Sequence, residues 1–403
     1  MNGKRLIEKI RLRNILSFGD KGEEITLEPL NIIVGQNASG KSNLIEIFHL
    51  LQDAAFGHIS ERIKDNGGIS QYLWRASNKF PIAEIGVFLS FKEIRKDLLF
   101  YGLKFKRNKQ NFEIVEEEIT PENKLFDDDF YYSNKNAVNN LVYRKELKSG
   151  KEEIIVREEP REKSDSTKSI LGTLPETYNT FDVIYKIKKF YRDFLIFEDW
   201  NFYYPREPRI PAKLGSEQSD FLSEDGTNLA IIIHEFREND AAYKKLIENF
   251  KKVYSSVEKL ETEEQSSTIQ LYIREKGLEQ RISAYRLSNG TLRYLCLLAI
   301  LCHPEPPPLI CIEEPETGLH PDILPTIAEL MIEASQRTQL IVTTHSDILV
   351  SAFSEIPEAV LVCEKDEDGT HFTRLEADKL KVWLDEYSLG ETWLRGGIGG
   401  TRW

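Results

Sequence analysis

The sequence predicts an α/β fold: a mixed or parallel sheet as the core, an antiparallel β-layer beside it, and an inserted α+β region of hairpins and helices. Three observations predict this. Leu30–Val34 is a mostly apolar run, and a glycine-bearing loop and an amphipathic segment follow it. Two later apolar runs, residues 308–315 and 339–345, end in glutamates and in a histidine, respectively. Such strand–helix–strand spacing is typical of parallel strands whose carboxyl ends meet at one edge.

The first elements predict a small β-layer. Residues 6–18 alternate over much of their length, which predicts a strand. A Gly-Asp-Lys-Gly turn at residues 19–22 leads to a second strand, Glu24–Leu27. Residues 82–91 and 98–105 also alternate, and we expect them to form a hairpin of the same layer.

Residues 35–42 have the sequence Gly-Gln-Asn-Ala-Ser-Gly-Lys-Ser, which matches the phosphate-binding P-loop. A strand, a glycine-bearing loop and a helix N-terminus together present several backbone N–H groups to one anion. We therefore expect a bound nucleotide, with Lys41 reaching its β- and γ-phosphates and Ser42 holding Mg²⁺. The expected binding residues are Gly35, Asn37, Ser39, Gly40, Lys41, Ser42 and Asn43.

The middle of the chain is charged and predicts an insertion. Its short alternating runs predict four strands, at residues 112–119, 130–133, 138–144 and 152–156, and residues 158–168 are polar enough for a mobile loop. Three helices should follow, at residues 181–197, 225–236 and 241–257, with Asp225 or Thr227 capping the second. Because no heptad pattern is sustained, we expect no coiled-coil arm.

The C-terminal part contributes three elements in a fixed order. Leu287–Arg293 precedes an apolar helix, residues 294–302. The run 308–315 ends in Glu313 and Glu314, and the run 339–345 ends in His345. A carboxylate at a strand tip suits Mg²⁺, so Glu313 is expected to be a metal ligand, like Ser42.

The same strand tips carry the groups that hydrolysis needs. Glu314 is placed to orient and deprotonate the attacking water, and His345 can contact the γ-phosphate and the water. Together with Lys41, these are the expected catalytic residues.

Composition narrows the class of protein. The 403 residues are 40% hydrophobic and 30% charged, as in a soluble globular protein, and no apolar stretch approaches the length that spans a bilayer. The net charge of −13 argues against nonspecific binding of nucleic acid by the overall field. The four cysteines lack metal-ligand spacing, so we expect buried thiols and a reducing cytoplasm.

The chain resembles the ABC-type ATPase heads of the SMC/RecF group, within the P-loop NTPases. It is more similar still to small AAA-type ATPases related to the overcoming-lysogenisation-defect (OLD) nucleases. The resemblance rests on residues 13–18, 35–43, 287–293, 312–321 and 343–346, which are spread over about half of the chain.

The resemblance implies ATP as the nucleotide and a homodimer that sandwiches two ATP molecules. Ser288 and Gly290 of one subunit would face the γ-phosphate held by Lys41 of the other, and residues 317–319 would cross between the two sites. Asn289 and Thr291 depart from the usual Gly and Gln of transporter signatures, and Glu313 replaces the usual Asp.

OLD-type proteins also carry a Toprim nuclease domain, for which the roughly 58 residues after His345 are too few. Within them, residues 366–368 predict a hairpin turn rather than a metal site. The glycine-rich tail, residues 390–403, is expected either to dock on another protein or to fold back onto its own head.

We therefore expect three regions: an N-terminal lobe (1–105), an insertion (106–270) and a C-terminal lobe (271–403). The leading functional hypothesis is an ATPase whose ATP-dependent dimer gates a separately encoded effector, such as a nuclease, in antiphage defence or DNA repair. One alternative is a RecF-like clamp that ATP closes on DNA. Another is a switch that binds ATP but scarcely hydrolyses it. The analogy with the family carries the defence role.

Overall fold

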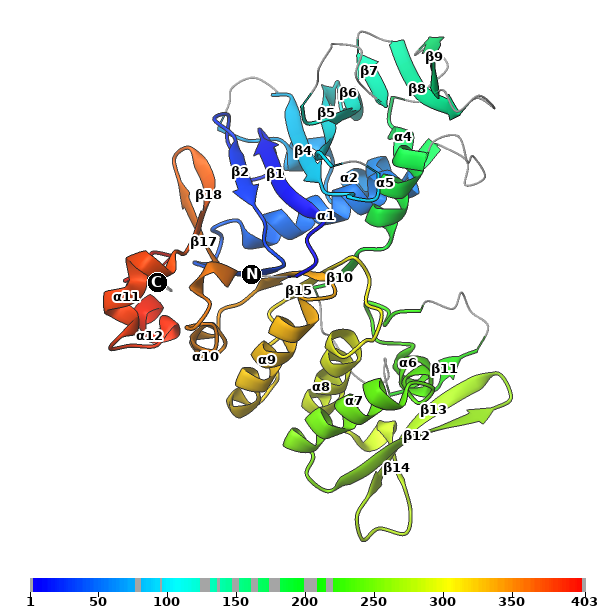
Figure 1. Cartoon of the computed structure of the whole chain (residues 1–403), viewed down its shortest axis with the longest axis vertical. Helices are drawn as coiled ribbons and strands as arrows, with labels where there is room; N and C mark the ends of the chain where they lie inside the picture. Colours follow the sequence, from blue (N-terminus) through cyan, green and yellow to red (C-terminus); the bar gives the residue numbers. More distant parts are fainter. Residues whose placement is uncertain are drawn as a thin grey trace.

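Two β-sheets face each other across helix α1 (Lys41–Phe56) in the computed structural model (Figure 1). The structure describes residues 3–76, 81–94, 96–123, 131–135, 138–146, 152–160, 166–173, 182–198, 209–214 and 220–400. A mixed α/β architecture with one mainly parallel and one antiparallel sheet confirms the predicted fold class.

The six-stranded sheet has the order β10 (Leu195–Phe197), β15 (Leu309–Glu313), β16 (Gln339–Thr343), β3 (Leu30–Gly35), β17 (Val360–Asp366) and β18 (Gly369–Arg374). All neighbours are parallel except the β17–β18 hairpin. Successive side chains of these strands point into two different hydrophobic cores. Ile33 and Ile341 belong to the core that contains α1, whereas Ile32 and Val342 belong to the core on the other face of the sheet. Burial on both faces explains why these strands are continuous apolar runs.

The second sheet is antiparallel and has eight strands. Its order is β2 (Glu23–Thr26), β1 (Ile7–Arg13), β4 (Ala83–Leu89), β5 (Leu99–Asn108), β6 (Asn111–Pro121), β7 (Tyr132–Lys135), β8 (Val138–Glu146) and β9 (Glu152–Pro160). The four strands expected in the insertion therefore continue the N-terminal layer. The expected division after residue 105 falls inside β5, and that after residue 270 falls inside β13 (Thr268–Glu275).

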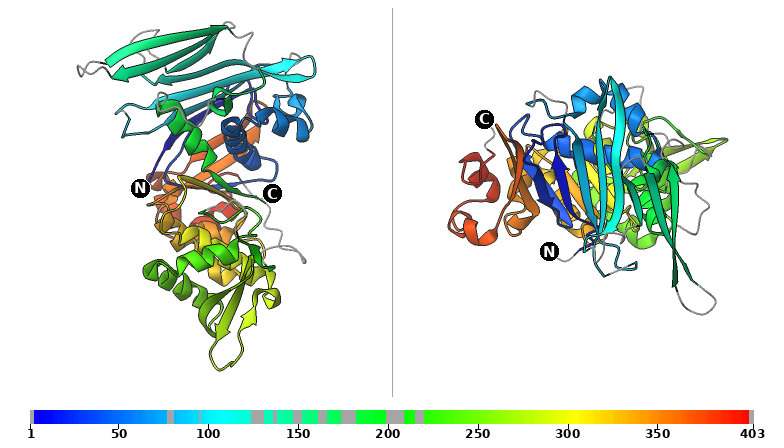
Figure 2. Two further views of the ribbon diagram at one scale, coloured as in Figure 1. Left: turned by 90° about the vertical axis from the view of Figure 1, so that its right-hand side faces the viewer. Right: turned by 90° about the horizontal axis from the view of Figure 1, so that it is seen from above.

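Helices cover the other face of the six-stranded sheet. They are α6 (Leu229–Phe236), α7 (Asp240–Val253), α8 (Asn289–Leu301) and α9 (Leu324–Ala334). Against α6 and α7 lies a small sheet in which β13 pairs with β11 (Ala212–Lys213), β12 (Val257–Gln265) and β14 (Ile282–Ser283). Figure 2 shows this sheet at the end of the molecule opposite the eight-stranded one. Within the described ranges, no helix is long and apolar enough to cross a membrane.

Shorter helices complete the described structure. Next to α1 lie α2 (Ile59–Asp65), α4 (Ile170–Thr173) and α5 (Asp182–Arg192), and α3 (Ile69–Tyr72) follows α2. At the C-terminal end, α10 (Asp347–Ser351), α11 (Ala377–Leu384) and α12 (Leu389–Leu394) form a small cluster beside the six-stranded sheet (Figure 1).

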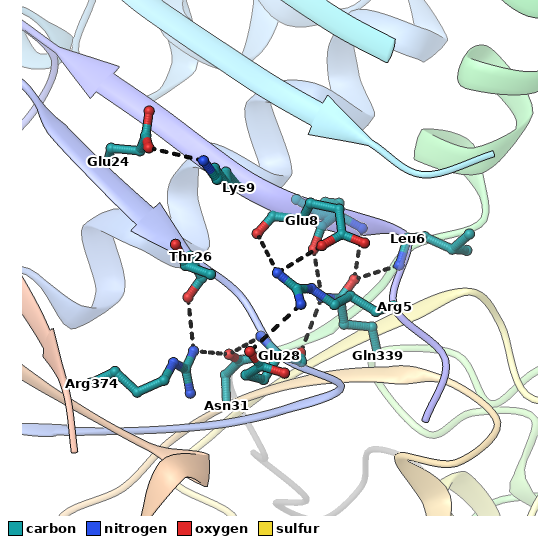
Figure 3. Close-up of polar contacts among 11 residues, drawn as sticks. Arg5, Leu6, Glu8, Lys9, Glu24, Thr26, Glu28, Asn31, Gln339 and Arg374 are labelled. Carbon is teal, nitrogen blue, oxygen red and sulfur yellow. Dashed lines mark hydrogen bonds and ion pairs between the residues drawn. The ribbon is translucent and has the colours of Figure 1, made fainter. Parts of the chain in front are cut away.

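Buried amide and guanidinium groups join the two sheets (Figure 3). The Gln339 side chain behaves like an extra strand residue, since its Oε1 accepts from Ile7 N (3.0 Å) and its Nε2 donates to Ile7 O (2.9 Å). Arg374 donates to Thr26 O (2.8 Å) and to Asn31 Oδ1 (2.6 Å). The Gln339 bonds satisfy backbone groups of the buried Ile7, and the Arg374 bonds connect β18 to β2 and β3 nearer the surface.

Two sequence predictions about the ends of elements were wrong. The first strand ends at Arg13 and not at residue 18, because Asn14 and Leu16 adopt positive φ (56° and 52°) in a tight turn. The helix expected at residues 181–197 ends at Arg192, and Leu195–Phe197 instead forms β10.

Two further predictions in the insertion need correction. Helix α6 begins at Leu229 after Asn228, and Asp225 does not cap it, because its Oδ1 accepts from Thr227 N instead. The expected mobile loop at 158–168 includes the last residues of β9 and the turn at 166–168, and residues 161–165 lie outside the described part.

Candidate functional site

The P-loop connects β3 to α1, and its close packing explains its glycines. A Cβ on Gly40, which has a φ of +118°, would lie 2.3 Å from Thr370 Oγ1, so only glycine fits. Thr370 Oγ1 also donates to Ser39 O (2.7 Å) and shares a hydrogen bond with the Ser17 hydroxyl (2.7 Å), which can act as its donor. The β17–β18 hairpin thus fixes the base of the loop, while its tip, with Asn37, is exposed.

Lys41 is the first residue of α1, and its side chain is buried against the loop. Its Nζ donates to Gly35 O (2.9 Å) and to Gln36 O (2.8 Å). Burial lowers the pKa of Lys41, and the nearby Glu313 and Glu314 partly oppose this shift. An ammonium held by carbonyls at a helix N-terminus can exchange them for phosphate oxygens, so the residues present fit a triphosphate.

Ser42 and Glu313 supply oxygen atoms beside this ammonium. Ser42 is exposed in the first turn of α1, with half-buried Asn43 after it, and its side chain hydrogen-bonds to Glu313. Burial raises the pKa of Glu313, and this hydrogen bond acts in the opposite direction. In the described residues, no three acidic, histidine or cysteine side chains form a metal-binding group. A hydroxyl and one carboxylate fit Mg²⁺, which completes its coordination with waters and substrate phosphates.

Glu314 has an unusual backbone conformation at the tip of β15. Its φ is +42°, and two hydrogen bonds hold it there: its N–H donates to Thr343 O (3.0 Å), and its carbonyl accepts from Arg293 Nη2 (3.0 Å). The side chain is about half exposed (51%), and its Oε1 lies 3.8 Å from His345 Nε2. Positive φ in a non-glycine residue is strained, and such strain is common at functional sites.

His345 follows β16, and Glu316 holds its backbone. The buried Glu316 Oε1 accepts from His345 N (2.8 Å) and from Thr344 Oγ1 (2.8 Å). Burial raises the pKa of Glu316. Because the sequence shows Glu316 only as one more acidic residue after Pro315, sequence reasoning assigned it no role.

The expected signature residues lie at the start of α8. Ser288 is its N-cap, and the Ser288 Oγ accepts from Thr291 N (3.1 Å). A Cβ on Gly290 would lie 2.8 Å from Gly318 O, so this residue contacts the expected crossing loop at 317–319. Within the described part of the chain, the hydrogen bonds of Ser288 do not involve residues 35–43.

Two further residues near the site were missed from the sequence. Glu198 directly follows Phe197, which pairs with Ile312, so Glu198 and Glu313 are neighbours at the tips of β10 and β15. Glu198 Oε1 lies 2.9 Å from His49 Nε2, and this hydrogen bond lowers the pKa of Glu198. Arg293 connects α8 to Glu314, and burial lowers its pKa to about 10. Glu198 could have been found only from the pairing of β10 with β15, which the sequence does not show.

The structure therefore brings the P-loop residues, Glu313, Glu314 and His345 to one edge of the parallel sheet. The signature residues are held apart, on the helical layer beneath it. Glu313 pairs with Thr343, and Thr343 pairs with Ile33 two residues before the P-loop, so β15 and β16 end at the same sheet edge as β3.

Solved structures of Smc head domains share this fold. One is described as the SmcHead bound to the C-winged helix domain of ScpA; it has a TM-score of 0.51 and 16% identity over 94% of this chain and 100% of that one. Another is the Smc head domain with an extended coiled coil bound to the C-terminal domain of ScpA from Pyrococcus furiosus, with a TM-score of 0.53 and 14% identity over 94% and 99%. At these identities the likeness concerns the fold, which is that of an ABC-type head.

No curated protein sequence matches the chain. A family match covers residues 30–351, which include the P-loop, the signature loop, both glutamates and His345. The chain belongs to the family described as "AAA domain, putative AbiEii toxin, Type IV TA system".

Proposed function

We propose that the protein is a Mg²⁺-dependent ATP hydrolase that dimerises around ATP and thereby gates a separate effector protein. The observation that carries the hydrolase is the position of Glu314, a partly exposed carboxylate in a strained conformation, 3.8 Å from His345 on the adjacent strand tip. Lys41 lies near the same carboxylate.

The chemistry divides among named residues. Lys41 and the backbone N–H groups of the P-loop bind the phosphates. Ser42 and Glu313 would hold Mg²⁺, which would supply positive charge to the bound phosphates. Glu314 accepts a proton from the attacking water while the water oxygen bonds to the γ-phosphorus. The bond from that phosphorus to the β–γ bridging oxygen breaks, which yields ADP and inorganic phosphate. His345 orients the water and the γ-phosphate.

The exposed signature loop supports the homodimer. Ser288 is exposed at the N-terminus of α8, where a helix end favours an anion. In a two-fold dimer the same loop of a second copy can approach the first copy's P-loop, and each subunit would complete the other's site.

The effector that the ATPase would gate is a separate protein. The two Smc heads described above are bound to domains of ScpA, a precedent for a head that engages another protein. We propose an effector such as a nuclease, in antiphage defence or DNA repair, and a cytoplasmic setting that fits four buried free thiols.

Direct binding of DNA has less support. Three basic side chains on the described part of the eight-stranded sheet are ion-paired, which lowers the positive field that a DNA clamp needs; the pairs are Arg11–Glu24, Lys104–Glu116 and Lys106–Glu113.

Steady-state ATP turnover tests the hydrolase. Lys41→Ala should abolish turnover by removing phosphate binding. Glu314→Gln should lower kcat by about 100-fold or more, because an amide cannot accept the proton. Lys244→Ala and Glu248→Gln are matched controls on exposed α7 side chains and should retain wild-type turnover. Equal turnover in Glu314→Gln and wild type would rule out Glu314 as the base.

Light scattering with ATP tests the dimer, because Glu314→Gln should trap it. A monomer at saturating ATP would contradict the sandwich.

Purification together with the product of the neighbouring gene, followed by a nuclease assay with and without ATP, tests the effector. Nuclease activity that does not depend on ATP would contradict gating.

A further inference from the structure

A glycine inside helix α12 marks an unusually close contact. Gly390 is the second residue of this six-residue helix. A Cβ there would lie 2.0 Å from Asp347 O and 2.3 Å from Ser351 Oγ. The glycine therefore lets the backbone of α12 touch the backbone of α10, which no larger residue permits without displacement.

Several other contacts hold α12 in this place. Leu389, Thr392 and Trp393 are fully buried. Leu389 N donates to Ser354 Oγ (2.9 Å) just beyond α10, and a capping box of Ser388 and Glu391 fixes the first turn. As far as residue 400, the tail is therefore folded back onto its own head, which is one of the two arrangements expected from the sequence.

The other end of this segment reaches the P-loop. Gly400 N donates to Glu364 Oε1 (2.9 Å), and Gly400 O accepts from the buried Trp393 Nε1 (2.7 Å). A Cβ on Gly400 would lie 3.4 Å from Gly35 Cα and 2.8 Å from Val362 Cγ1. Gly35 is the first residue of the P-loop motif, so the segment contacts the loop at its root.

The two ends of the segment therefore contact two different elements that carry expected site residues, α10 after His345 and the P-loop at Gly35. Helix α10 begins with N-cap Ser346, the residue after His345, and Gly390 contacts its first residue, Asp347. We call residues 388–400 the C-terminal strap. It lies beside α10 and β17 in Figure 1, and it comes after the end of the family match at residue 351.

We propose that the C-terminal strap is a positioning element for ATP hydrolysis, which sets the place of His345 through α10 and the place of the P-loop through Gly35. This inference rests on the proposed hydrolase. Gly390 and Gly400 are positioning residues, since each acts through a neighbour and not on the substrate. Because the two ends contact different elements, a substitution at each end should change a different kinetic constant.

Gly390→Ala should lower kcat by about 10-fold or more with the KM for ATP within about twofold, because the added methyl group displaces α10 and with it His345. Gly400→Ala should instead raise the KM for ATP several-fold with less effect on kcat, because it disturbs the root of the P-loop. Gly277→Ala is the matched control for Gly400, since it also has positive φ (+78°) but has open space around its Cβ.

A purely structural strap predicts a different result. Both variants would then melt at a lower temperature while the folded fraction kept wild-type kcat and KM, and this outcome would overturn the proposal. If Gly390→Ala does not fold, Ser388→Ala replaces it; this variant removes the capping box and the Ser351 contact without adding an atom, and should lower kcat by about threefold.

Failure of the hydrolase is distinguishable from failure of the strap. If the wild type binds ATP without turnover, the proposed hydrolysis fails, and affinity for a fluorescent ATP analogue still tests Gly400→Ala against Gly277→Ala; equal affinities would overturn the strap. If the wild type hydrolyses ATP and both strap variants match it in kcat and KM, the hydrolase stands and the strap proposal is wrong.

Discussion

The P-loop half of the site is largely buried by contacts with the rest of the chain, whereas the signature half is exposed and Ser288 there hydrogen-bonds to the nearby Thr291. Gly40 is wedged against Thr370, and Lys41 is buried on two carbonyls of its own loop. Ser288 and Asn289 are exposed. The difference suggests that the P-loop half is already arranged to bind a nucleotide. The exposed signature half is placed to contact another molecule.

The two halves are nevertheless connected inside one subunit. Arg293, on the same helix as Ser288, donates to the carbonyl of Glu314, and Gly290 lies against Gly318 O in the loop after that glutamate. A surface that docks on the signature loop would therefore press on the residues that position Glu314, the proposed base. If the proposed dimer forms, this connection offers a physical reason for the proposed turnover to depend on it.

The largest expected effect comes from mixing two inactive variants. Lys41→Ala breaks the first half of the site, and Ser288→Arg blocks the second with a bulky cation at its exposed N-cap. Each alone should lose turnover by about 100-fold or more. In an equal mixture, half of the dimers are mixed and each has one intact site, so about a quarter of wild-type turnover should return.

The mixing experiment needs a check that mixed dimers form, by light scattering with ATP. Ser288→Ala is a milder companion to Ser288→Arg, because it removes the cap but adds no bulk. If mixed dimers form and turnover stays absent, Ser288 acts within its own subunit, and the contrast between the two halves has no functional meaning.

The sequence predicted which residues lie together at the sheet edge better than it predicted the bounds of the elements around them. Parallel strands such as β15 and β16 are buried on both faces, so they appear as apolar runs whose next residues must lie at the sheet edge. That regularity makes Glu313, Glu314 and His345 visible to sequence reasoning. The P-loop can be predicted from the sequence in the same way, because its glycines occupy positions where a side chain would clash with neighbouring atoms.

Contacts between distant segments were not predictable in the same way. Strand β10 has three residues that continue the apolar period of α5, so only its pairing with β15 reveals a strand. Glu316 and Gly390 look ordinary in the sequence, because their roles depend on a backbone N–H and a carbonyl elsewhere in the chain. The predicted boundary after residue 105 falls inside β5 for the same reason, because only strand pairing shows that the sheet continues into β6.

A smaller effect should follow from the carboxylate that orients His345. Glu316→Ala removes the acceptor of both His345 N and Thr344 Oγ1, so kcat should fall by about 10-fold and unfolding should become easier by about 1–3 kcal/mol. Glu316→Gln keeps an acceptor oxygen and should retain most of the activity. Stopped-flow phosphate release and thermal melts measure the two effects. An unchanged kcat in Glu316→Ala would show that the His345 backbone holds its place without this bond.

The smallest expected effect concerns the hairpin that fixes the P-loop half. His371, next to Thr370, lies between Glu23 Oε2 (3.0 Å) and Asp366 Oδ1 (3.1 Å). Burial lowers the pKa of His371, but the hydrogen bonds and charges of both carboxylates raise it above the ordinary value overall. The protonated form is therefore stabilised by folding, and its contribution is fully present below the unfolded pKa of about 6.5 and is lost as pH rises through the folded pKa.

His371→Gln should remove this pH dependence. Because the side chain is 38% exposed and water screens the pair, the difference in unfolding free energy between low and high pH should be less than about 1 kcal/mol. Denaturant unfolding of both proteins between pH 5.5 and 8.5, a range around the ordinary histidine pKa of about 6.5, measures it, with His320→Gln as the control at an exposed histidine (76%). A wild-type protein that gains stability relative to His371→Gln as the pH rises would reverse the sign and show that the hairpin holds the loop by neutral hydrogen bonds alone.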